Sequence, residues 1–182
     1  MSRLLVAGSV GIALMVACQS TTGPDLSHSA ALNTTALPLT ATISFGLNDH
    51  SSPFPPQQGH DHSTNAADNL VPRTVVIGQG GSVTFEIDPV HQAAVYQPGI
   101  LPGDIQVNAS TLEDVDLGFI ILPNFRINDP NGRLALAPAQ ALTDQSWTTP
   151  AGTFDQPGTY LVICTTLPHF AVNKMYGWVI VQ

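Results

Sequence analysis

The sequence predicts an all-β fold with many turns, and three observations support this prediction. Glycine and proline number 15 each among 182 residues, and they separate short runs rich in valine, isoleucine, threonine and tyrosine, as strands joined by turns require. Charged residues make up only 10% of the chain, which is low for a globular domain. We find no long apolar period of the helical kind and no internal repeat. The length is enough for one domain with a full core.

The first residues have the pattern of an export signal. Met1–Arg3 is short and positive, and Leu4–Val16 is an apolar run of 13 residues, the length of a signal-peptide core and too short to span a bilayer. The end of this run, Met15–Cys18, resembles the lipobox of bacterial lipoproteins, with Met where Leu is usual. We therefore expect residues 1–17 to be a lipoprotein signal peptide and Cys18 to carry the lipid. An ordinary secretory signal is the alternative.

This resemblance implies a chain that is exported and lipid-anchored at the cell envelope. Gln19 is not the Asp that retains lipoproteins in the inner membrane, which favours the periplasmic side of the outer membrane in a cell that has one. Residues 18–39 are rich in Ser, Thr, Ala and Pro and predict a flexible tether. The folded domain is expected at residues 40–182.

The charge balance excludes one class of partner. Removal of residues 1–17 takes away Arg3 and no acid, which changes the net charge from −8 to −9 with His neutral. Proteins that bind nucleic acid carry basic patches, so we expect no nucleic-acid partner. An acidic chain is compatible with a basic partner such as a cytochrome.

The first half of the domain contains four segments that predict strands. Thr40–Leu47 is the first of them. Val71–Ile77 and Ser82–Ile87 flank the glycine-rich segment Gly78–Gly81, and this pattern predicts a hairpin. Ala93–Tyr96 is a short fourth strand.

Between the first two strands lies a polar segment with three histidines. Asn48–Asn69 contains His50, His60 and His62. A His-rich tract is a compositional signal only, and a solvated loop is its more frequent meaning. The alternative is a secondary metal site for capture or transfer.

The middle of the chain, residues 97–147, gives weaker signals. Gly118–Leu122 predicts a buried strand, and Ala135–Leu142 predicts a turn of helix that its internal proline weakens. Trp147 and Phe154 are expected in the core. The middle also contains an acidic cluster, expected to be a solvated face or alternatively a partner-docking surface, at Glu113, Asp114 and Asp116.

The last 25 residues hold the strongest chemical signal. Gly158–Cys164 and Tyr176–Gln182 predict two strands joined by a loop of 11 residues. Cys164, His169 and Met175 lie at the start, middle and end of this connection. Each residue alone is more typical of packing or of the surface. Together, a thiolate, an imidazole and a thioether suit a copper ion that cycles between Cu(I) and Cu(II).

The segment from Phe154 to Cys164, followed by the spacing Cys164-x4-His169, resembles the copper loop of plastocyanins and azurins, the cupredoxins. The resemblance implies a Greek-key β-sandwich with one type 1 copper ion. It also implies that His91, in the turn Pro89–Gln92 after a strand, is the first copper ligand. The implied ligand set is thus His91, Cys164 and His169, with Met175 as the weak axial ligand.

The sequence departs from the family pattern in two places. The spacing from His169 to Met175 is longer than in azurin or plastocyanin, so a backbone carbonyl or another side chain is an alternative axial ligand. Gln92 stands where the family has an Asn that tethers the ligand loops, which leaves that tether open. The resemblance further implies an apolar patch around His169, made here by Leu167, Pro168 and Phe170.

The expected function is a mononuclear copper protein that carries single electrons between redox partners, such as a cytochrome or another copper protein, and is not an enzyme. One alternative is a copper-binding or carrier lipoprotein that uses the His-rich loop. A copper oxidoreductase would need His beside Cys164, where Ile163 and Thr165 stand instead. A structural domain without metal is disfavoured by the complete ligand set.

Overall fold

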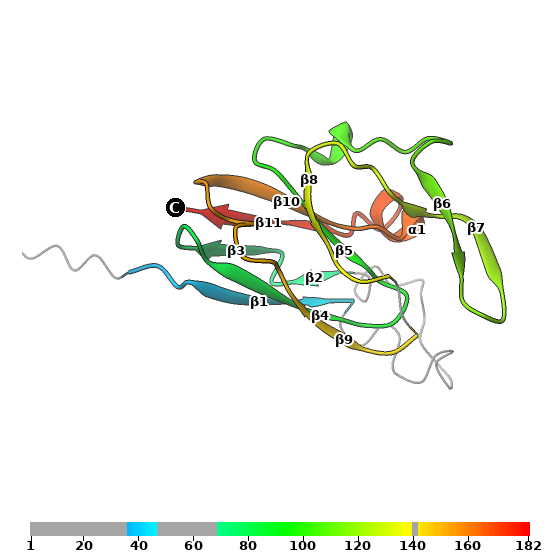
Figure 1. Ribbon diagram of the computed structural model, residues 1–182, viewed down its shortest axis with the longest axis horizontal. Coiled ribbons are helices and arrows are strands. Elements are labelled where there is room, and N and C mark those ends of the chain that lie inside the picture. The colour runs from blue at the N-terminus through cyan, green and yellow to red at the C-terminus, as the bar shows by residue number, and fades with distance from the viewer. Residues whose placement is uncertain (1–35, 47–68, 140–141) are drawn as a thin grey trace, which may run out of the picture. The chain divides into compact units, whose positions relative to one another are not determined.

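The computed structural model is a sandwich of two β-sheets (Figure 1). It describes residues 36–46, 69–139 and 142–182, so the expected signal peptide, Cys18, most of the tether and the three histidines His50, His60 and His62 lie outside the described residues. The first sheet contains β1 (Thr40–Phe45), β2 (Leu70–Val71), β4 (Ser82–Ile87) and β9 (Gln145–Thr148), in the order β2-β1-β4-β9. The second sheet, in the order β3-β11-β10-β5-β8, contains β3 (Thr74–Ile77), β5 (Ala93–Tyr96), β8 (Arg133–Leu136), β10 (Gly158–Cys164) and β11 (Tyr176–Val181). The predicted all-β sandwich is confirmed.

The main core lies between the two sheets. Alternate residues of β1 and β4 point inward, and Phe45 and Phe85 meet edge to face with ring centroids 5.9 Å apart. From the second sheet, Tyr160, Val162 and Cys164 join the same buried cluster. The period-2 alternation along each strand therefore places one face of each sheet in a shared core.

The second sheet is covered on its outer face as well. All four residues of β5 and the last five of β10 are buried, which explains their continuous apolar runs. Tyr96, Leu161 and Ile163 belong to a second buried cluster, which Ile105, Ile127 and Phe170 complete from outside the sandwich. The strand that ends at Cys164 is therefore fixed from both sides.

The hairpin predicted at residues 71–87 is wrong. β3 pairs in parallel with β11, and β4 pairs in parallel with β1 and antiparallel with β9, so the two strands lie in different sheets. The chain before β1 takes the place of the expected partner, because the Ser82 N–H donates to the Leu39 carbonyl over 2.9 Å. The glycine-rich turn thus connects the two sheets. The final antiparallel pair, β10 with β11, is confirmed.

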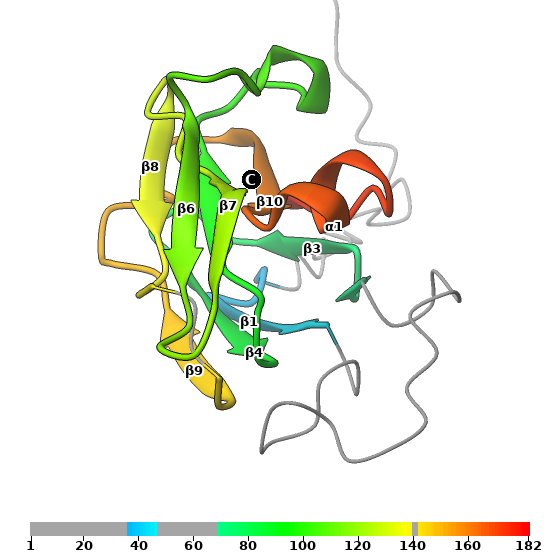
Figure 2. The same cartoon turned by 90° about the vertical axis from the view of Figure 1, so that its right-hand side faces the viewer.

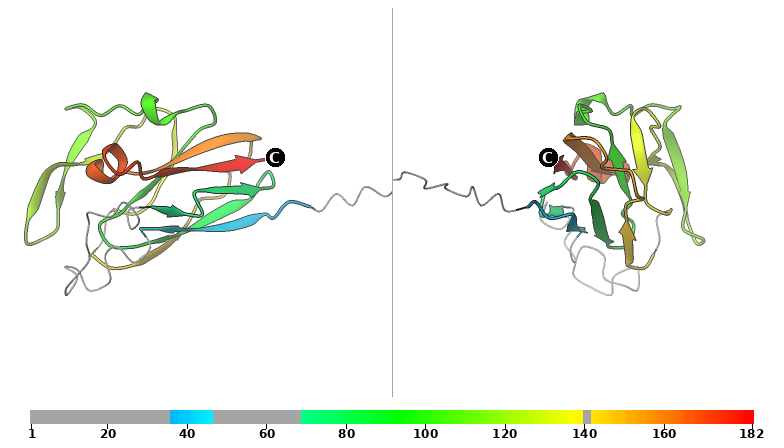
Figure 3. Two further views of the ribbon diagram at one scale, coloured as in Figure 1. Left: turned by 180° about the vertical axis from the view of Figure 1, so that it is seen from behind. Right: turned by 60° about the vertical axis from the view of Figure 1, so that its left-hand side comes forward.

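A separate two-stranded hairpin projects beyond the sandwich (Figures 2 and 3). It consists of β6 (Leu112–Asp116) and β7 (Ile121–Ile127). The prediction of a buried strand at residues 118–122 is wrong for Gly118–Ile120, which form the turn, and right only in that Ile121 and Leu122 begin β7. The segment is also not buried, because Phe119, Ile120 and Ile121 are exposed. The turn of helix predicted at Ala135–Leu142 is also wrong at its start, where β8 pairs with β5.

Two short helical segments complete the described structure. A 3-10 turn, η1, spans Pro102–Asp104, and α1 spans Leu167–Ala171 within the loop between β10 and β11. Within the described ranges, no helix has the length and apolar character needed to cross a membrane.

Candidate metal centre

Three side chains that can bind a metal meet inside the protein, at the end of the sandwich near α1. The Nδ1 atoms of His91 and His169 lie 3.6 and 3.8 Å from Cys164 Sγ, and 3.0 Å from each other. His91 and Cys164 are fully buried, and His169 is 8% exposed. In the part of the chain that the structure describes, these residues form the one group of three or more His, Cys, Asp or Glu side chains placed to hold an ion.

These distances fit a bound transition metal. Metal–nitrogen bonds of about 2.0 Å and metal–sulfur bonds of about 2.3 Å, as in zinc sites, place such donors about 3 to 4 Å apart around one ion. All three donor atoms lie within 4.8 Å of one another. Buried lone pairs that converge in this way are costly without a proton or a cation between them. The arrangement of the residues therefore fits the implied ion.

The three side chains reach the centre from different kinds of backbone. Cys164 ends β10 and His169 lies in the middle of α1, where Pro168 occupies an early helical position that suits its missing N–H. His91 follows Val90, whose φ of 69° is unusual for a β-branched residue. The Thr166 hydroxyl donates to the Val90 carbonyl over 2.6 Å and so holds this turn in place.

Gln92 supplies the tether that the sequence left open. Its backbone carbonyl accepts from the Thr165 N–H over 2.9 Å, and its side-chain Oε1 accepts from the Thr165 hydroxyl over 2.8 Å. Its Nε2 donates to the carbonyls of Ala137 and Pro138 over 2.9 and 3.0 Å. The longer amide thus joins the His91 turn, the Cys164 strand and the end of β8 in one buried network.

The backbone of Met175 is hydrogen-bonded to two residues of the centre. Its carbonyl accepts from the Cys164 N–H over 3.0 Å, and its N–H donates to the His169 carbonyl over 2.9 Å. Lys174, with φ of 57°, turns the chain back after α1. The Met175 side chain is fully buried in the main core, in the same cluster as Cys164. Its role as the axial ligand stays a prediction.

Sequence reasoning missed Gly46, which ends β1 next to His91. Its φ is +81°, and a Cβ there would lie 2.3 Å from His91 Nε2, inside the contact distance of real atoms. The Gly46 N–H also donates to the Asn69 carbonyl over 2.9 Å. The position therefore gives the imidazole its space, and a glycine at a strand end was the one signal for it in the sequence.

The expected apolar patch around His169 differs in its members. Leu167 and Pro168 are half-buried, but Phe170 is only 7% exposed because its ring packs into the second buried cluster. Val172, at 73% exposure, is the large apolar side chain of this loop that faces solvent. Phe170 is therefore excluded from the exposed patch.

Comparison by shape finds solved β-sandwich structures that resemble this chain. An auracyanin from the photosynthetic bacterium Roseiflexus castenholzii is 19% identical, covers 81% of this chain and 99% of its own, and has a TM-score of 0.45. An azurin from Methylomonas sp. strain J is 14% identical over 79% of this chain and 97% of its own, with a TM-score of 0.44. A purple cupredoxin from Nitrosopumilus maritimus is 15% identical over 78% and 99%, with a TM-score of 0.37.

No protein-family model matches the chain, and no curated protein matches it.

Proposed function

We propose that this protein carries single electrons at one mononuclear type 1 copper site. The observation that carries the proposal is the buried meeting of one thiol and two imidazole Nδ1 atoms within 4.8 Å. A His2Cys donor set with a weak axial Met is typical of blue-copper electron-transfer sites. When bound, copper supplies one-electron chemistry between Cu(I), which soft sulfur favours, and Cu(II), while imidazole serves both states.

The protein's own part is to hold the donors still. The bonds from Thr165 to Gln92 and from Thr166 to Val90 fix the His91 turn against the segment that follows Cys164. The bond from the Met175 N–H to the His169 carbonyl fixes the return of the loop. Because the donors already lie at bonding separations, a change of one electron requires little movement of the chain. Preorganisation of this kind lowers the cost of reorganisation.

Burial supports the same function. His91 and Cys164 are closed off from solvent, which excludes water from the donor atoms and keeps the thiolate from oxidising side reactions. His169 is the most exposed of the three residues, which supports a route for electrons through its side chain. We propose that electrons enter or leave at α1.

A non-enzymatic role is part of the proposal. Ile163 and Thr165, which flank Cys164, are both fully buried, and neither can bind a second metal through an imidazole. Among the described residues, a second group of metal-binding side chains is not found. An oxidoreductase of the multicopper type passes electrons from its thiolate ligand through neighbouring histidines, which this strand lacks.

We further propose that the chain is exported and lipid-anchored through Cys18 at the cell envelope, and that it exchanges electrons there with another redox protein. The lipobox-like end of the apolar leader supports the anchor. Mass spectrometry of the mature N-terminus tests it, since a diacylglyceryl cysteine is expected. A free N-terminus at another residue would contradict it.

The test of the copper site is spectroscopic. The full chain, purified in mild detergent, is titrated with Cu(II), and its visible and electron paramagnetic resonance spectra are recorded with those of Cys164→Ser. We expect an intense thiolate-to-copper band that ascorbate bleaches and that Cys164→Ser lacks. Copper binding without that band, retained in Cys164→Ser but lost when His60 and His62 are replaced, would overturn electron carriage in favour of copper capture.

A further inference from the structure

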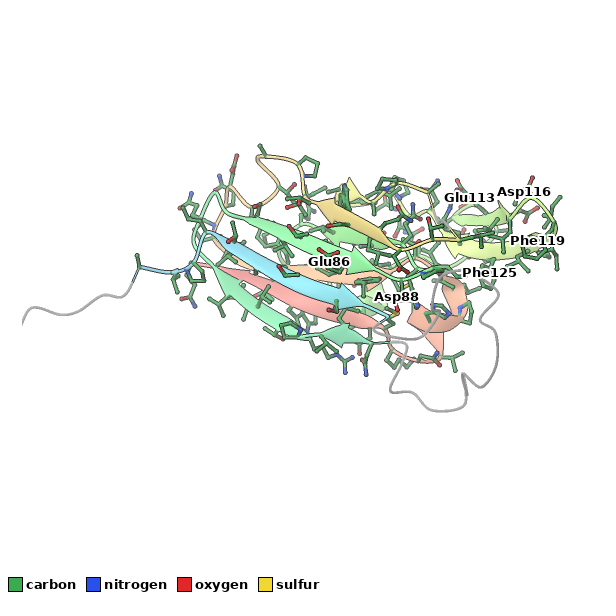
Figure 4. All side chains as sticks on the ribbon, turned by 90° about the horizontal axis from the view of Figure 1, so that it is seen from below. Glu86, Asp88, Glu113, Asp116, Phe119 and Phe125 are labelled. Carbon is green, nitrogen blue, oxygen red and sulfur yellow. The ribbon has the colours of Figure 1, made fainter. Side chains whose placement is uncertain are left out.

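The tip of the β6–β7 hairpin exposes three consecutive large apolar side chains. Phe119, Ile120 and Ile121 are 65%, 47% and 61% exposed. Figure 4 shows Phe119 at the outer end of the hairpin, away from the sandwich. A group of adjacent exposed apolar side chains leaves favourable burial unused, and such patches mark interaction sites.

The tip stands on a firmly held base. Ile127 is buried in the second core cluster, and its N–H donates to the Thr165 carbonyl over 2.7 Å. The backbone of Arg126 forms an isolated antiparallel β-bridge with Thr166, and its side chain forms an ion pair with Glu113. Val115, halfway along β6, is 6% exposed. The hairpin therefore presents its apolar tip on a fixed support, as a docking anchor requires.

The charges beside the tip select the kind of partner. Asp114 and Asp116 are exposed, and Asp116 lies directly opposite Ile121 in the strand register, so that a carboxylate and an apolar group share one face. Arg126, the one cation of the hairpin, is already paired with Glu113. A positively charged surface is complementary to this face, whereas anionic lipid and a second copy of this acidic chain are repelled by it.

The base of the hairpin adjoins the metal centre. Thr165, which accepts the bond from Ile127, directly follows Cys164, and α1 with His169 lies against β7. The chain enters β1 at Thr40, at the opposite end of the sandwich (Figure 1). A partner held by the tip is therefore on the side of the sandwich that carries the three clustered side chains, and not at the end where the chain enters β1.

We propose that the β6–β7 tip docks the redox partner of this protein, and that this partner is a one-electron carrier protein with a positively charged surface around an apolar contact. This inference rests on the electron-carrier function proposed above. In one encounter the reduced partner would lose one electron, and that electron would reduce the copper held by His91, Cys164 and His169.

The test uses the copper-loaded full chain in detergent and a lysine-rich mitochondrial-type cytochrome c as the probe. Stopped-flow mixing gives the second-order rate constant at several ionic strengths, and titration calorimetry with oxidised cytochrome c gives binding without electron transfer. The tip variant is Phe119→Ser with Ile121→Ser, and its control is Leu39→Ser, a side chain 60% exposed at the other end. The charge variant is Asp116→Asn, whose amide oxygen still accepts the Gly118 N–H, and its control is Asp155→Asn.

We expect the tip variant to lower the rate constant about tenfold and to weaken binding by a similar factor. Asp116→Asn should lower the rate about two- to threefold at low ionic strength, and added salt should remove this difference. Both controls, the visible band and the reduction by ascorbate should stay unchanged.

Rate constants and affinities of both variants within about twofold of the wild type would overturn the docking proposal. The proposal would also be overturned if the tip variant kept the rate constant and affinity of the wild type and only lowered the apparent mass of the protein. That result would mean that the tip binds a second copy of this chain. Failure of the copper function is a separate result: the wild type would lack the Cys164-dependent band, while calorimetry would still report whether the tip binds the cytochrome.

Discussion

Gly46 shows how one missing side chain can define a ligand position. Its φ of +81° and the 2.3 Å separation between an added Cβ and His91 Nε2 make two distinct demands on this position. The first is conformational, and a left-handed backbone costs an L-residue about 1–2 kcal/mol. The second is steric, because the imidazole has to move if a methyl group is added.

We predict that Gly46→Ala lowers copper affinity at least tenfold, because His91 leaves the distance that it shares with Cys164 and His169. Gly80→Ala is the matched control, since Gly80 has a φ of +77° but has nothing within 4 Å of an added Cβ. Both variants should lose about 1–2 kcal/mol of unfolding free energy from the backbone alone. Copper titration followed at the visible band separates them, and equal copper affinity in the two variants would refute the steric argument.

Gln92 makes a second prediction at the residue scale. It is 2% exposed, and Thr165, which donates to it, is fully buried. Gln92→Leu leaves the Thr165 hydroxyl and two carbonyls without this partner, and each buried unsatisfied group costs about 1–3 kcal/mol. Because the bond to the Pro138 carbonyl is only partly buried, the sum of these costs lies at its lower end, and we expect the unfolding free energy of the copper-free protein to fall by about 3–4 kcal/mol in urea titrations.

A double-mutant cycle isolates the bond itself. Thr165→Val removes the hydroxyl at nearly constant volume, and the coupling energy between this change and Gln92→Leu should be about 1 kcal/mol. Additive losses in the double variant would show that the two side chains act independently, against the tether.

At this scale the sequence could predict the clustered side chains better than the groups that support them. Cys164 and His169 were singled out by their spacing within one loop, and His91 by resemblance in the turn after a strand; the structure brings the three together, and their binding of copper stays a prediction. Gly46 and the Thr165 hydroxyl act across long stretches of chain, and no local pattern connects them to the ligands. Gln92 could be singled out as a departure, but whether its longer side chain reaches Thr165 depends on backbone positions that only the structure supplies.

At the scale of elements, the base of the β6–β7 hairpin carries an ion pair with a defined pH dependence. Hydrogen bonds from Arg126, and then from Asn128, hold the pKa of Glu113 below its ordinary value. A carboxylate with a lowered folded-state pKa contributes stability above its unfolded pKa, which is about 4.3. That contribution is lost as the pH falls through the lower folded pKa.

We predict that Glu113→Gln lowers the unfolding free energy at pH 7 by roughly 0.2–1 kcal/mol, the range of partly exposed ion pairs. The difference from the wild type should shrink as the pH falls through the folded pKa, because Glu113 is then itself uncharged. Urea titrations in steps from pH 7 into acid measure this trend. Asp144→Asn, in the exposed loop before β9, is the control, and a Glu113→Gln deficit that does not shrink with falling pH would contradict the ion pair as its cause.

At this scale the sequence predicted where strands lie better than it predicted their neighbours in the sheet or their burial. The alternation in β4 identified a strand but not its neighbours, because hydrogen-bond partners in a sandwich are chosen by chain crossings such as that of Leu39 beside Ser82. The apolar residues 118–122 have the composition of a buried strand, yet they stand at the tip of a hairpin. Composition shows that a segment favours burial and does not show whether its own chain buries it.

At the scale of the whole molecule, the packing of the two sheets holds His91, Cys164 and His169 together. His91 connects the first sheet to β5 of the second, while Cys164 and His169 lie in and after β10. Both sheets must be packed for these residues to meet. Folding therefore creates the metal site, and an ion that binds only the folded state stabilises the whole domain by linkage.

We predict that copper binding raises the melting temperature of the domain by about 8–16 °C. At a copper concentration about a thousandfold above Kd, linkage contributes about 4.1 kcal/mol, and each kcal/mol shifts the melting temperature by about 2–4 °C in a domain of roughly 150 residues. Removing the ion with a chelator should reverse the shift. Cys164→Ser should show little of the rise in calorimetric scans at equal copper, since it removes the thiolate while conserving side-chain size. Binding at this site can stabilise the fold only through the three side chains that hold the ion. A Cys164→Ser variant that copper stabilises as strongly as the wild type would therefore mean that copper binds elsewhere in the chain.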